Sequence, residues 1–254
     1  MSFAVAAEAY DRFMGRYSAP LAAPFADFAG IAAGRRGRAL DVGCGPGALT
    51  GELVRRLGPD AVAAVDPSAP FVAAARERHP GVDVRQAAAE ELPFPDGAFD
   101  ATLAQLVVHF LTDPVSGLRE LARVTRPGGV VAACVWDHAG GGGPLAAFWD
   151  AARALDPAVE DESGLAGARE GQLAELLEAA GLEAVEQGVV ASVVEHPSFD
   201  EWWEPFTLGV GPAGSYAAGL DPERRERLRR LCRERLPTAP FAIEAHAWAA
   251  RGRA

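Results

Sequence analysis

The sequence contains no lysine, few cysteines and no apolar stretch long enough to span a bilayer. Its three cysteines, Cys44, Cys134 and Cys232, are odd in number, far apart and without a CxxC pair, which argues against a disulfide framework. His, Cys, Asp and Glu do not recur at metal-ligand spacing, so we expect no bound metal. The long basic side chains are all arginine, which indicates a codon bias and not a function.

Positive charge is outnumbered by negative charge, since 24 arginines stand against 35 aspartates and glutamates and the formal net charge is −11. Attraction to phosphate would not hold such a chain on a nucleic acid or an anionic membrane. The arginine-rich stretch 223–235 is interrupted by glutamates, as is typical of a solvated helix face. The N-terminus, MSFAVAAEAYDRF, has no basic segment ahead of an apolar one and does not resemble a signal peptide. We therefore expect a cytoplasmic protein, either a monomer or a homodimer.

The first half of the chain alternates between strand-like and helix-like segments. Apolar runs predict strands at 38–43, 61–66 and 82–88, within 99–110, and at 128–136. Apolar residues with helical spacing follow at 48–58, Ser68 can cap a second helix, and Asp113 with Pro114 begins a third. Such alternation predicts an α/β fold, with a parallel sheet covered by helices on both faces.

The pattern changes after residue 137. The glycine-rich stretch 138–145 is expected to be flexible or tightly turned, and its glycine run 140–143 to be a linker or a hinge. Helices are predicted near 145–155, over 171–182 and within 198–237, and strands over 183–196 and 241–252. Trp202, Trp203 and Phe206 lie in an amphipathic stretch, where they form either the core of a cap or an aromatic wall over an apolar ligand.

The stretch ALDVGCGPGALTG (39–51) contains the first candidate site. Gly43, Gly45 and Gly47 fall where a strand passes into a helix, so the backbone either turns sharply or approaches a ligand. The helix N-terminus there offers unpaired N–H groups and the positive end of its dipole. Asp66 closes the second strand, nineteen residues after Gly47. A carboxylate at that place accepts hydrogen bonds from ribose hydroxyls, so the ligand is expected to carry an adenosine-like ribose.

The spacing of the glycines distinguishes between two cofactors. A dinucleotide site has the pattern G-x-G-x-x-G, whereas this chain has G-x-G-x-G preceded by Asp41. A carboxylate beside the loop disfavours a pyrophosphate and favours a cation. S-adenosylmethionine carries an ammonium and a sulfonium and no phosphate, so the sequence favours it over NAD. A nucleotide-cofactor oxidoreductase remains the alternative.

Five motifs in order, LDVGCGPG, VDPS, AEELPFPDGAFD, VVHFLTDP and LARVTRPGG, resemble the class I S-adenosylmethionine-dependent methyltransferases. Within that family, the chain is similar to the branch that includes ubiquinone/menaquinone-biosynthesis and many small-molecule methyltransferases. The resemblance covers residues 8–136, and beyond 140 only the general layout matches. It implies a Rossmann-like, seven-stranded, mostly parallel sheet, an antiparallel last strand around 241–250 and a helical lid.

The resemblance also implies which residues bind the methionyl part of the cofactor. These are Asp41 and the backbone of Gly43, Cys44, Gly45 and Gly47. Gln105 would offer its backbone carbonyl to the ammonium. Tyr10 and Arg16, in the lid-like stretch AYDRFMGRYS (9–18), would close over the cofactor, with Arg16 a candidate for the methionyl carboxylate. Cys44 is then a small residue that fits the loop and not a nucleophile.

The adenosine part is expected beside the second and third strands. The residues implied for it are Asp66 on the ribose, with Pro67, Ser68, Ala89 and Glu90 beside the adenine. Where relatives often have an aspartate before the Ala-Glu pair, this chain has Ala88. A side-chain contact to the adenine amino group is therefore expected to be missing.

Methyl transfer needs an aligned nucleophile and the exclusion of water, and it needs a base only when the acceptor must lose a proton early. His109, just after the fourth strand, is the candidate catalytic base. The alternative is that His109 only packs against the cofactor pocket. His138, after the fifth strand, is a second candidate, with a residue on the rim of the site as its alternative.

Together these features predict a single methyltransferase domain over 1–254. It would comprise N-terminal lid helices (1–36), a cofactor-binding core (37–136) and acceptor-side lid insertions (137–170 and 197–237). The expected function is S-adenosylmethionine-dependent methyl transfer to a small organic molecule. The alternative is a non-catalytic regulatory or scaffold protein that binds S-adenosylmethionine or S-adenosylhomocysteine.

Overall fold

The computed structural model of the protein describes residues 7–34 and 36–254. The first six residues, on which the predictions of an N-terminal lid and of no signal peptide partly rest, lie outside the described residues, as does Arg35. In this described part, no helix is both long and apolar enough to cross a membrane.

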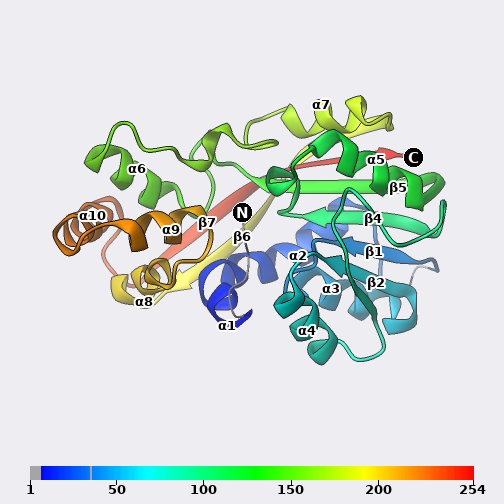
Figure 1. Ribbon diagram of the computed structural model, residues 1–254, viewed down its shortest axis with the longest axis horizontal. Coiled ribbons are helices and arrows are strands. Elements are labelled where there is room, and N and C mark those ends of the chain that lie inside the picture. The colour runs from blue at the N-terminus through cyan, green and yellow to red at the C-terminus, as the bar shows by residue number, and fades with distance from the viewer. Residues whose placement is uncertain (1–6, 35) are drawn as a thin grey trace.

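Seven strands of the described chain form one sheet in the order β3-β2-β1-β4-β5-β7-β6 (Figure 1). The strands are β1 (Ala39–Val42), β2 (Val62–Asp66), β3 (Asp83–Gln86), β4 (Phe99–Gln105), β5 (Thr125–Trp136), β6 (Glu183–His196) and β7 (Phe241–Arg253). Strands β1 to β5 are parallel, and β7 lies antiparallel between β5 and β6. The predicted mixed sheet with an antiparallel last strand is confirmed. The strand order reverses between β1 and β4, where open sheets of this kind bind their ligands.

Helices cover both faces of the sheet (Figure 1). They are α2 (Arg16–Phe28), α3 (Ala48–Leu57) and α4 (Ala69–Arg78) on one face, and α5 (Pro114–Val124) and α7 (Gln172–Ala179) on the other. Strand β1 shows why both faces are covered, because its side chains alternate between two apolar layers. Ala39 packs in the same core cluster as Leu53 of α3, and Leu40 packs in the same cluster as Leu118 of α5.

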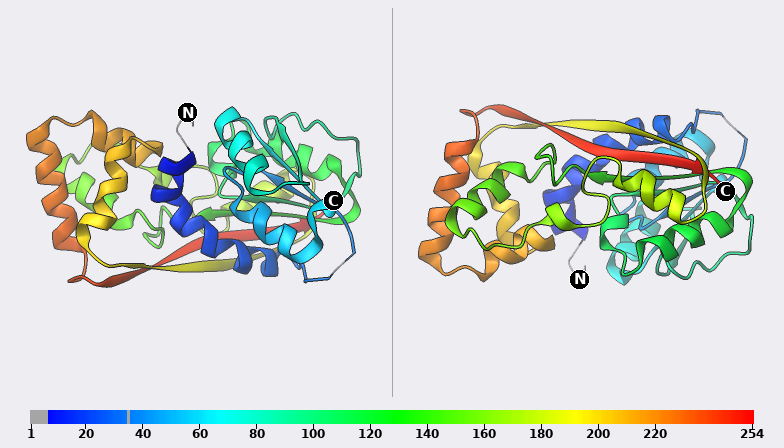
Figure 2. Two further views of the ribbon diagram at one scale, coloured as in Figure 1. Left: turned by 90° about the horizontal axis from the view of Figure 1, so that it is seen from below. Right: turned by 90° about the horizontal axis from the view of Figure 1, so that it is seen from above.

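A separate apolar cluster lies beyond the ends of β6 and β7, at the other end of the molecule (Figures 1 and 2). We call it the helical group: α6 (Ala146–Leu155), α8 (Phe199–Trp203), η5 (Glu204–Leu208), α9 (Gly211–Gly219) and α10 (Pro222–Arg235). At its centre, the fully buried Phe148 stacks on Phe206 with ring centroids 4.5 Å apart. Trp202 and Trp203 are buried in this same cluster.

The N-terminal segment, α1 (Ala7–Tyr10) and η1 (Asp11–Gly15), lies between the sheet and the helical group (Figure 2). It contacts α4 on one side and η5 on the other. The Tyr10 ring packs against Phe71 of α4, with centroids 5.2 Å apart. Phe13 packs edge-on against Phe206 of η5, also at 5.2 Å. This segment therefore connects the sheet domain with the helical group.

The glycine run after β5 is a fixed turn and not a free linker. The backbone N–H groups of Gly140 and Gly142 donate to the two carboxylate oxygens of Asp137, at 2.7 and 3.2 Å. The indole N–H of Trp248 donates to the same carboxylate at 3.1 Å. A Cβ atom at Gly140 would lie 2.5 Å from an Asp137 oxygen, so the turn needs a residue without a side chain. Two of these donors are local, three and five residues from Asp137, whereas Trp248 comes from β7 through the tertiary fold, which the sequence did not show.

Candidate active site

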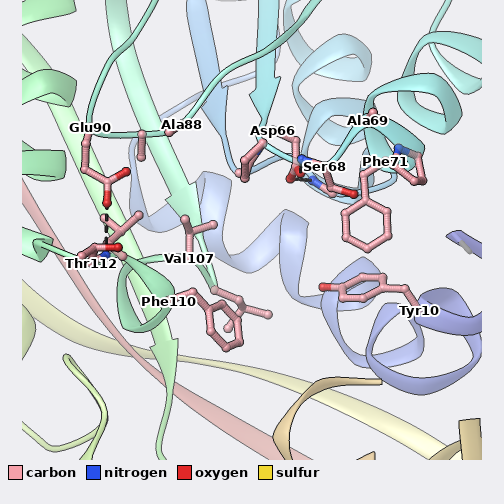
Figure 3. A pocket seen from close by; sticks show the side chains of 17 residues that line it. Tyr10, Asp66, Ser68, Ala69, Phe71, Ala88, Glu90, Val107, Phe110 and Thr112 are labelled. Carbon is pink, nitrogen blue, oxygen red and sulfur yellow. Dashed lines mark hydrogen bonds between the residues drawn. The ribbon is translucent and has the colours of Figure 1, made fainter. Parts of the chain in front are cut away.

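Two cavities meet at the carboxyl ends of β1, β2 and β4. One has a volume of about 530 Å³ and lies between the ends of β2 and β4 and the N-terminal segment (Figure 3). The other has a volume of about 270 Å³ and lies around the loop after β1. Tyr10, Gly43 and Gly45 line both cavities, so the two adjoin at the glycine loop.

The glycine loop has a conformation that side chains do not permit. Gly43 has φ +69° and Gly47 has φ +102°, both in the left-handed region. A Cβ atom at Gly43 would lie 2.4 Å from a methyl carbon of Val107, and one at Gly47 would lie 2.6 Å from the ring of His79. The loop therefore packs tightly on its protein side while its other side lines the cavities.

Asp66 is held by two backbone N–H groups at the end of β2. Its Oδ2 accepts from Gly45 N and its Oδ1 from Ser68 N, both at 2.8 Å. Burial raises the pKa of this carboxyl, and the two backbone hydrogen bonds oppose the rise. The carboxylate is thereby fixed against the 530 Å³ cavity, and each oxygen keeps a lone pair for a further donor.

Two buried side-chain oxygens line the 270 Å³ cavity without a hydrogen-bond partner among the described residues: Asp41 Oδ1 and Gln105 Oε1. The other Asp41 oxygen accepts from Thr50 Oγ1 at 2.6 Å. The Gln105 amide donates to Ser18 O at 3.0 Å. Burial raises the pKa of Asp41 to about 7. Buried acceptors without a donor are costly, so this end of the cavity is built for a ligand that donates hydrogen bonds or carries positive charge.

The far end of the larger cavity lies between β3 and the segment after β4. Ala88, Ala89 and Glu90 line it on one side and Phe110 on the other. Glu90 Oε1 accepts from Thr112 N at 3.1 Å, which fixes its carboxylate at the rim (Figure 3). Ala88 lines this end with only a methyl group, so it offers no side-chain hydrogen bond to a ligand.

A third cavity, of about 30 Å³, lies on the side of the helical group and is called the smallest cavity, since it is the smallest of these three. His109, His138 and Glu162 line it, together with Tyr10 and Phe110, which it shares with the larger cavity. Burial lowers the pKa of His109 well below its ordinary value and that of His138 to about 4, so both imidazoles are neutral at neutral pH. Burial raises the pKa of Glu162 to about 7, while Trp149 Nε1 donates to its Oε2 at 2.8 Å.

Comparison with known proteins bears directly on this site. Residues 40–133, from β1 to β5, match the family described as "Methyltransferase domain". The chain is 42% identical over 129 residues to an uncharacterised methyltransferase of Mycobacterium tuberculosis, covering 51% of this chain and 49% of that protein. It is 38% identical over 98 residues to the chloroplastic 2-methyl-6-phytyl-1,4-hydroquinone methyltransferase 2 of rice, covering 38% of this chain and 28% of the rice protein.

The match to a methyltransferase domain therefore extends over 94 of the 254 residues. These two and six further curated relatives match over 28% to 57% of their own lengths, so the chain spans less than two thirds of each.

Solved structures agree with this fold. The YcgJ protein of Bacillus subtilis superimposes with a TM-score of 0.56 at 20% identity, covering 92% of this chain and 97% of that protein. A geranyl diphosphate C-methyltransferase of Streptomyces coelicolor, solved with S-adenosylhomocysteine, gives 0.52 at 16% identity, covering 92% and 77%. At such identities the likeness shows the fold alone.

Most residues implied by the sequence line the two larger of these cavities. They are Tyr10, Asp41, Gly43, Cys44, Gly45, Gly47, Asp66, Pro67, Ser68, Ala89, Glu90 and Gln105. For Gln105 it is the side-chain amide oxygen that is buried without a partner in the described chain, although the sequence pointed to its backbone carbonyl. Burial raises the pKa of the Cys44 thiol, which keeps it protonated.

Arg16 is not brought to either cavity. Its guanidinium forms an ion pair with Glu201 at 2.7 Å and lies 3.3 Å from Nδ1 of the buried His196. The cation that does line the 270 Å³ cavity is Arg78, at the end of α4. Arg78 pairs with Asp11 at 2.5 Å and donates to Pro46 O, within the glycine loop, at 3.3 Å. The sequence could not distinguish the two arginines, because both lie on helices near the site.

Other lining residues were missed from the sequence for a similar reason. They are Phe71, Leu106, Val107, Phe110 and His79 around the two larger cavities, and Trp136 and Glu162 around the smallest. Leu106, Val107 and Phe110 directly follow β4, so their position after a buried strand was a usable signal. Glu162 gave no such signal, because a tertiary contact with Trp149 brings it in.

Proposed function

We propose that this protein is an S-adenosylmethionine-dependent methyltransferase that acts on a small organic molecule. The observation that carries the proposal is the pair of buried, unpartnered oxygens, Asp41 Oδ1 and Gln105 Oε1, beside the glycine loop. An ammonium group supplies several N–H donors and a positive charge, so the amino end of S-adenosylmethionine fits this pair. A pyrophosphate would instead meet two buried carboxylates, Asp41 and Asp66, which disfavours NAD.

We propose the following places for the cofactor in the two cavities. Asp66 would accept from the ribose hydroxyls, since both of its oxygens are oriented by backbone donors and keep free lone pairs. The adenine would lie between the segment around Ala89 and the segment after β4. The methionyl carboxylate would lie toward Arg78, the cation that lines the smaller of these two cavities, and not toward Arg16.

When bound, the cofactor supplies a methyl group activated by its sulfonium. The chain has to orient the acceptor and exclude water. Tyr10, Leu106 and Phe110 line both the 530 Å³ and the 30 Å³ cavities, so they form the wall at which cofactor and acceptor would meet. His109 is the candidate base at this wall, since its imidazole is neutral at neutral pH and can accept a proton.

The helical group and the N-terminal segment are proposed to act as the lid over the acceptor. The smallest cavity is enclosed by Phe13 and Met14 from one side and by Leu145 and Val210 from the other. A mainly apolar enclosure of this size suits part of a small molecule better than a macromolecule. With a net charge of −11 the protein is expected not to bind nucleic acid, and to work in the cytoplasm as a monomer or homodimer.

Calorimetric titration of the wild-type protein with S-adenosylmethionine, S-adenosylhomocysteine and NADH tests the proposal. We expect micromolar binding of the two sulfur compounds and none of NADH. Asp66→Ala should weaken binding at least tenfold. The matched control is Asp60→Ala, because Asp60 is exposed at the opposite, amino-terminal end of β2 and should leave binding unchanged.

Binding of NADH, or no loss in Asp66→Ala, would refute the cofactor assignment. Release of S-adenosylhomocysteine in the presence of an acceptor then distinguishes an enzyme from a non-catalytic binding protein. Binding of the cofactor without release across a broad acceptor panel would favour the regulatory or scaffold alternative.

A further inference from the structure

The smallest cavity has a distinctive polar end made of two histidine rings. His109 Nδ1 and His138 Nε2 are both buried, and neither has a hydrogen-bond partner within residues 7–34 and 36–254. The ring centroids lie 5.8 Å apart and the ring planes are inclined at 61°. Only 6% of the His109 surface is exposed. Two unsatisfied nitrogens in one small cavity indicate a ligand group that can hydrogen-bond to both.

The charges around this cavity restrict what that group can be. Among the described residues that line it, the only charged type is Glu162, and there is no arginine. An anionic acceptor, such as a carboxylate or phosphate, would be buried here without a counter-charge. Glu162 offers less to a cation than Asp41 does, because Trp149 Nε1 donates to its Oε2 and neither of its oxygens is a buried atom without a partner in the described chain.

The walls of the cavity are aromatic and apolar. Phe13, Phe110 and Trp136 line it, and Trp136 Nε1 already donates a hydrogen bond to the sulfur of Met14 at 3.3 Å. A volume of about 30 Å³ holds a group the size of a hydroxyl and not a whole ring. The remainder of such a ligand would extend past Tyr10 and Phe110, which the larger cavity shares. The polar group would therefore lie at the wall where the cofactor ends.

We propose that His109 and His138 bind the hydroxyl group of an uncharged, hydroxylated aromatic acceptor, such as a phenol or a hydroquinone. This assignment rests on the function proposed above. In the transfer step, an oxygen lone pair forms the new O–CH₃ bond while the C–S bond breaks, and its electron pair stays on sulfur. The O–H bond breaks and its proton passes to the neutral imidazole that accepts the hydroxyl hydrogen bond. The products are an aryl methyl ether, S-adenosylhomocysteine and an imidazolium that releases its proton to solvent.

Three ligands with the same ring system test the assignment: 2-naphthol, 2-naphthoate and 2-naphthylmethylammonium. Each is titrated by calorimetry at pH 7 into protein saturated with S-adenosylhomocysteine. We expect 2-naphthol to bind at least tenfold more tightly than the carboxylate and the ammonium compound. With S-adenosylmethionine in its place, mass spectrometry should detect 2-methoxynaphthalene.

Variants assign the effect to the two rings. His109→Phe and His138→Phe keep an aromatic ring but remove its nitrogens, and each should weaken 2-naphthol binding about tenfold. His138→Gln, which retains a hydrogen-bonding group, should lose less. The matched control is His246→Phe, because His246 is 45% exposed on β7 and lines none of these three cavities in the described structure. Binding of S-adenosylhomocysteine within twofold of wild type shows that each variant is folded.

Equal or tighter binding of the carboxylate or the ammonium compound would overturn the assignment, as would no binding of 2-naphthol. A preference for 2-naphthol that survives both phenylalanine variants would overturn it as well. Failure of the wild-type protein to bind S-adenosylhomocysteine would be a different result, because it would refute the proposed function itself.

Discussion

Replacing Asp41 with asparagine should separate the stability of the free protein from its affinity for the cofactor. Asp41 is 1% exposed, and one of its oxygens has no partner in the described chain. Its pKa is raised to about 7, first by burial and then by the nearby Asp66 carboxylate. An ammonium held against Asp41 would favour the ionised form, so cofactor binding should lower this pKa and require the carboxyl to lose its proton.

The size of the effect follows from that pKa. Below pH 7 the free protein carries a protonated Asp41, so the Kd for S-adenosylhomocysteine should rise about tenfold for each pH unit. Between pH 7.5 and pH 5 the loss approaches 100-fold. In Asp41→Asn this dependence should vanish, and the Kd at pH 7.5 should rise roughly 10- to 100-fold, since a charge-assisted hydrogen bond contributes about 1.5–3 kcal/mol.

Asp41→Asn should weaken cofactor binding but make the free protein more stable. A carboxyl whose folded pKa lies above its unfolded value stabilises the fold at low pH, and this contribution is lost as the pH rises through the folded pKa. The pKa of Asp41 is raised from the ordinary value of 3.8 to about 7, so at pH 8 the fold has lost roughly 4 kcal/mol of stability through this carboxyl. Asp41→Asn should recover a large part of it, because asparagine can still accept the hydrogen bond from Thr50.

Calorimetry from pH 5 to pH 7.5 and urea unfolding at pH 8 measure the two effects. The range stops at pH 7.5 because the amino group of the ligand begins to lose its proton above it. Asp60→Asn is the control, since Asp60 lies exposed at the other end of the sheet. The reasoning is refuted if the variant keeps the wild-type pH dependence, or if it binds the ligand as tightly as wild type at pH 7.5.

Three further predictions concern the same site and its support. Arg78→Met should raise the Kd for S-adenosylhomocysteine about three- to tenfold in calorimetry, whereas Arg16→Met should leave it within twofold. A larger loss of affinity in Arg16→Met than in Arg78→Met would restore Arg16, the arginine chosen from the sequence. Gly43→Ala should lower the free energy of unfolding in urea by at least about 2 kcal/mol and abolish cofactor binding. The φ angle of Gly43 is +69°, and the new methyl would lie 2.4 Å from a valine side chain. An unchanged unfolding midpoint would contradict this. Phe148→Ala should cost about 3–5 kcal/mol, since the ring is fully buried, while Val193→Ala at a 58% exposed position should cost under about 0.5 kcal/mol.

The residues proposed to bind the cofactor could be predicted from the sequence because they lie close together in the chain. One loop of thirteen residues contains Asp41 and the glycines, and Asp66 follows at the end of the next strand, so a single βαβ pattern places them together. The same regularity predicted the parallel sheet, whereas the antiparallel last strand was implied by the family resemblance and the order of the strands was not predicted. Boundaries differed by a few residues, as at β5, which begins at Thr125 rather than 128.

The acceptor half could not be predicted in the same way. Glu162 reaches the smallest cavity through a hydrogen bond from Trp149, and Trp248 of β7 donates to Asp137, the carboxylate that holds the glycine turn. Both contacts depend on how the helical group and the last strand pack, and no short motif encodes them. Trp202 lies in an amphipathic stretch that fits either a core or a pocket wall, and only the packing shows that it is buried in the helical group.

The N-terminal segment is where these two halves become one site. Tyr10 lines the cavity assigned to adenosine, the cavity assigned to the methionyl part and the cavity assigned to the acceptor. Next to it, Asp11 pairs with Arg78 beside the glycine loop, and Phe13 packs against Phe206 of the helical group. A ligand in any of these cavities therefore contacts a segment that also shapes the other two. Binding free energies are reciprocal, so if the cofactor orders this segment and tightens acceptor binding, the acceptor must tighten cofactor binding by the same factor.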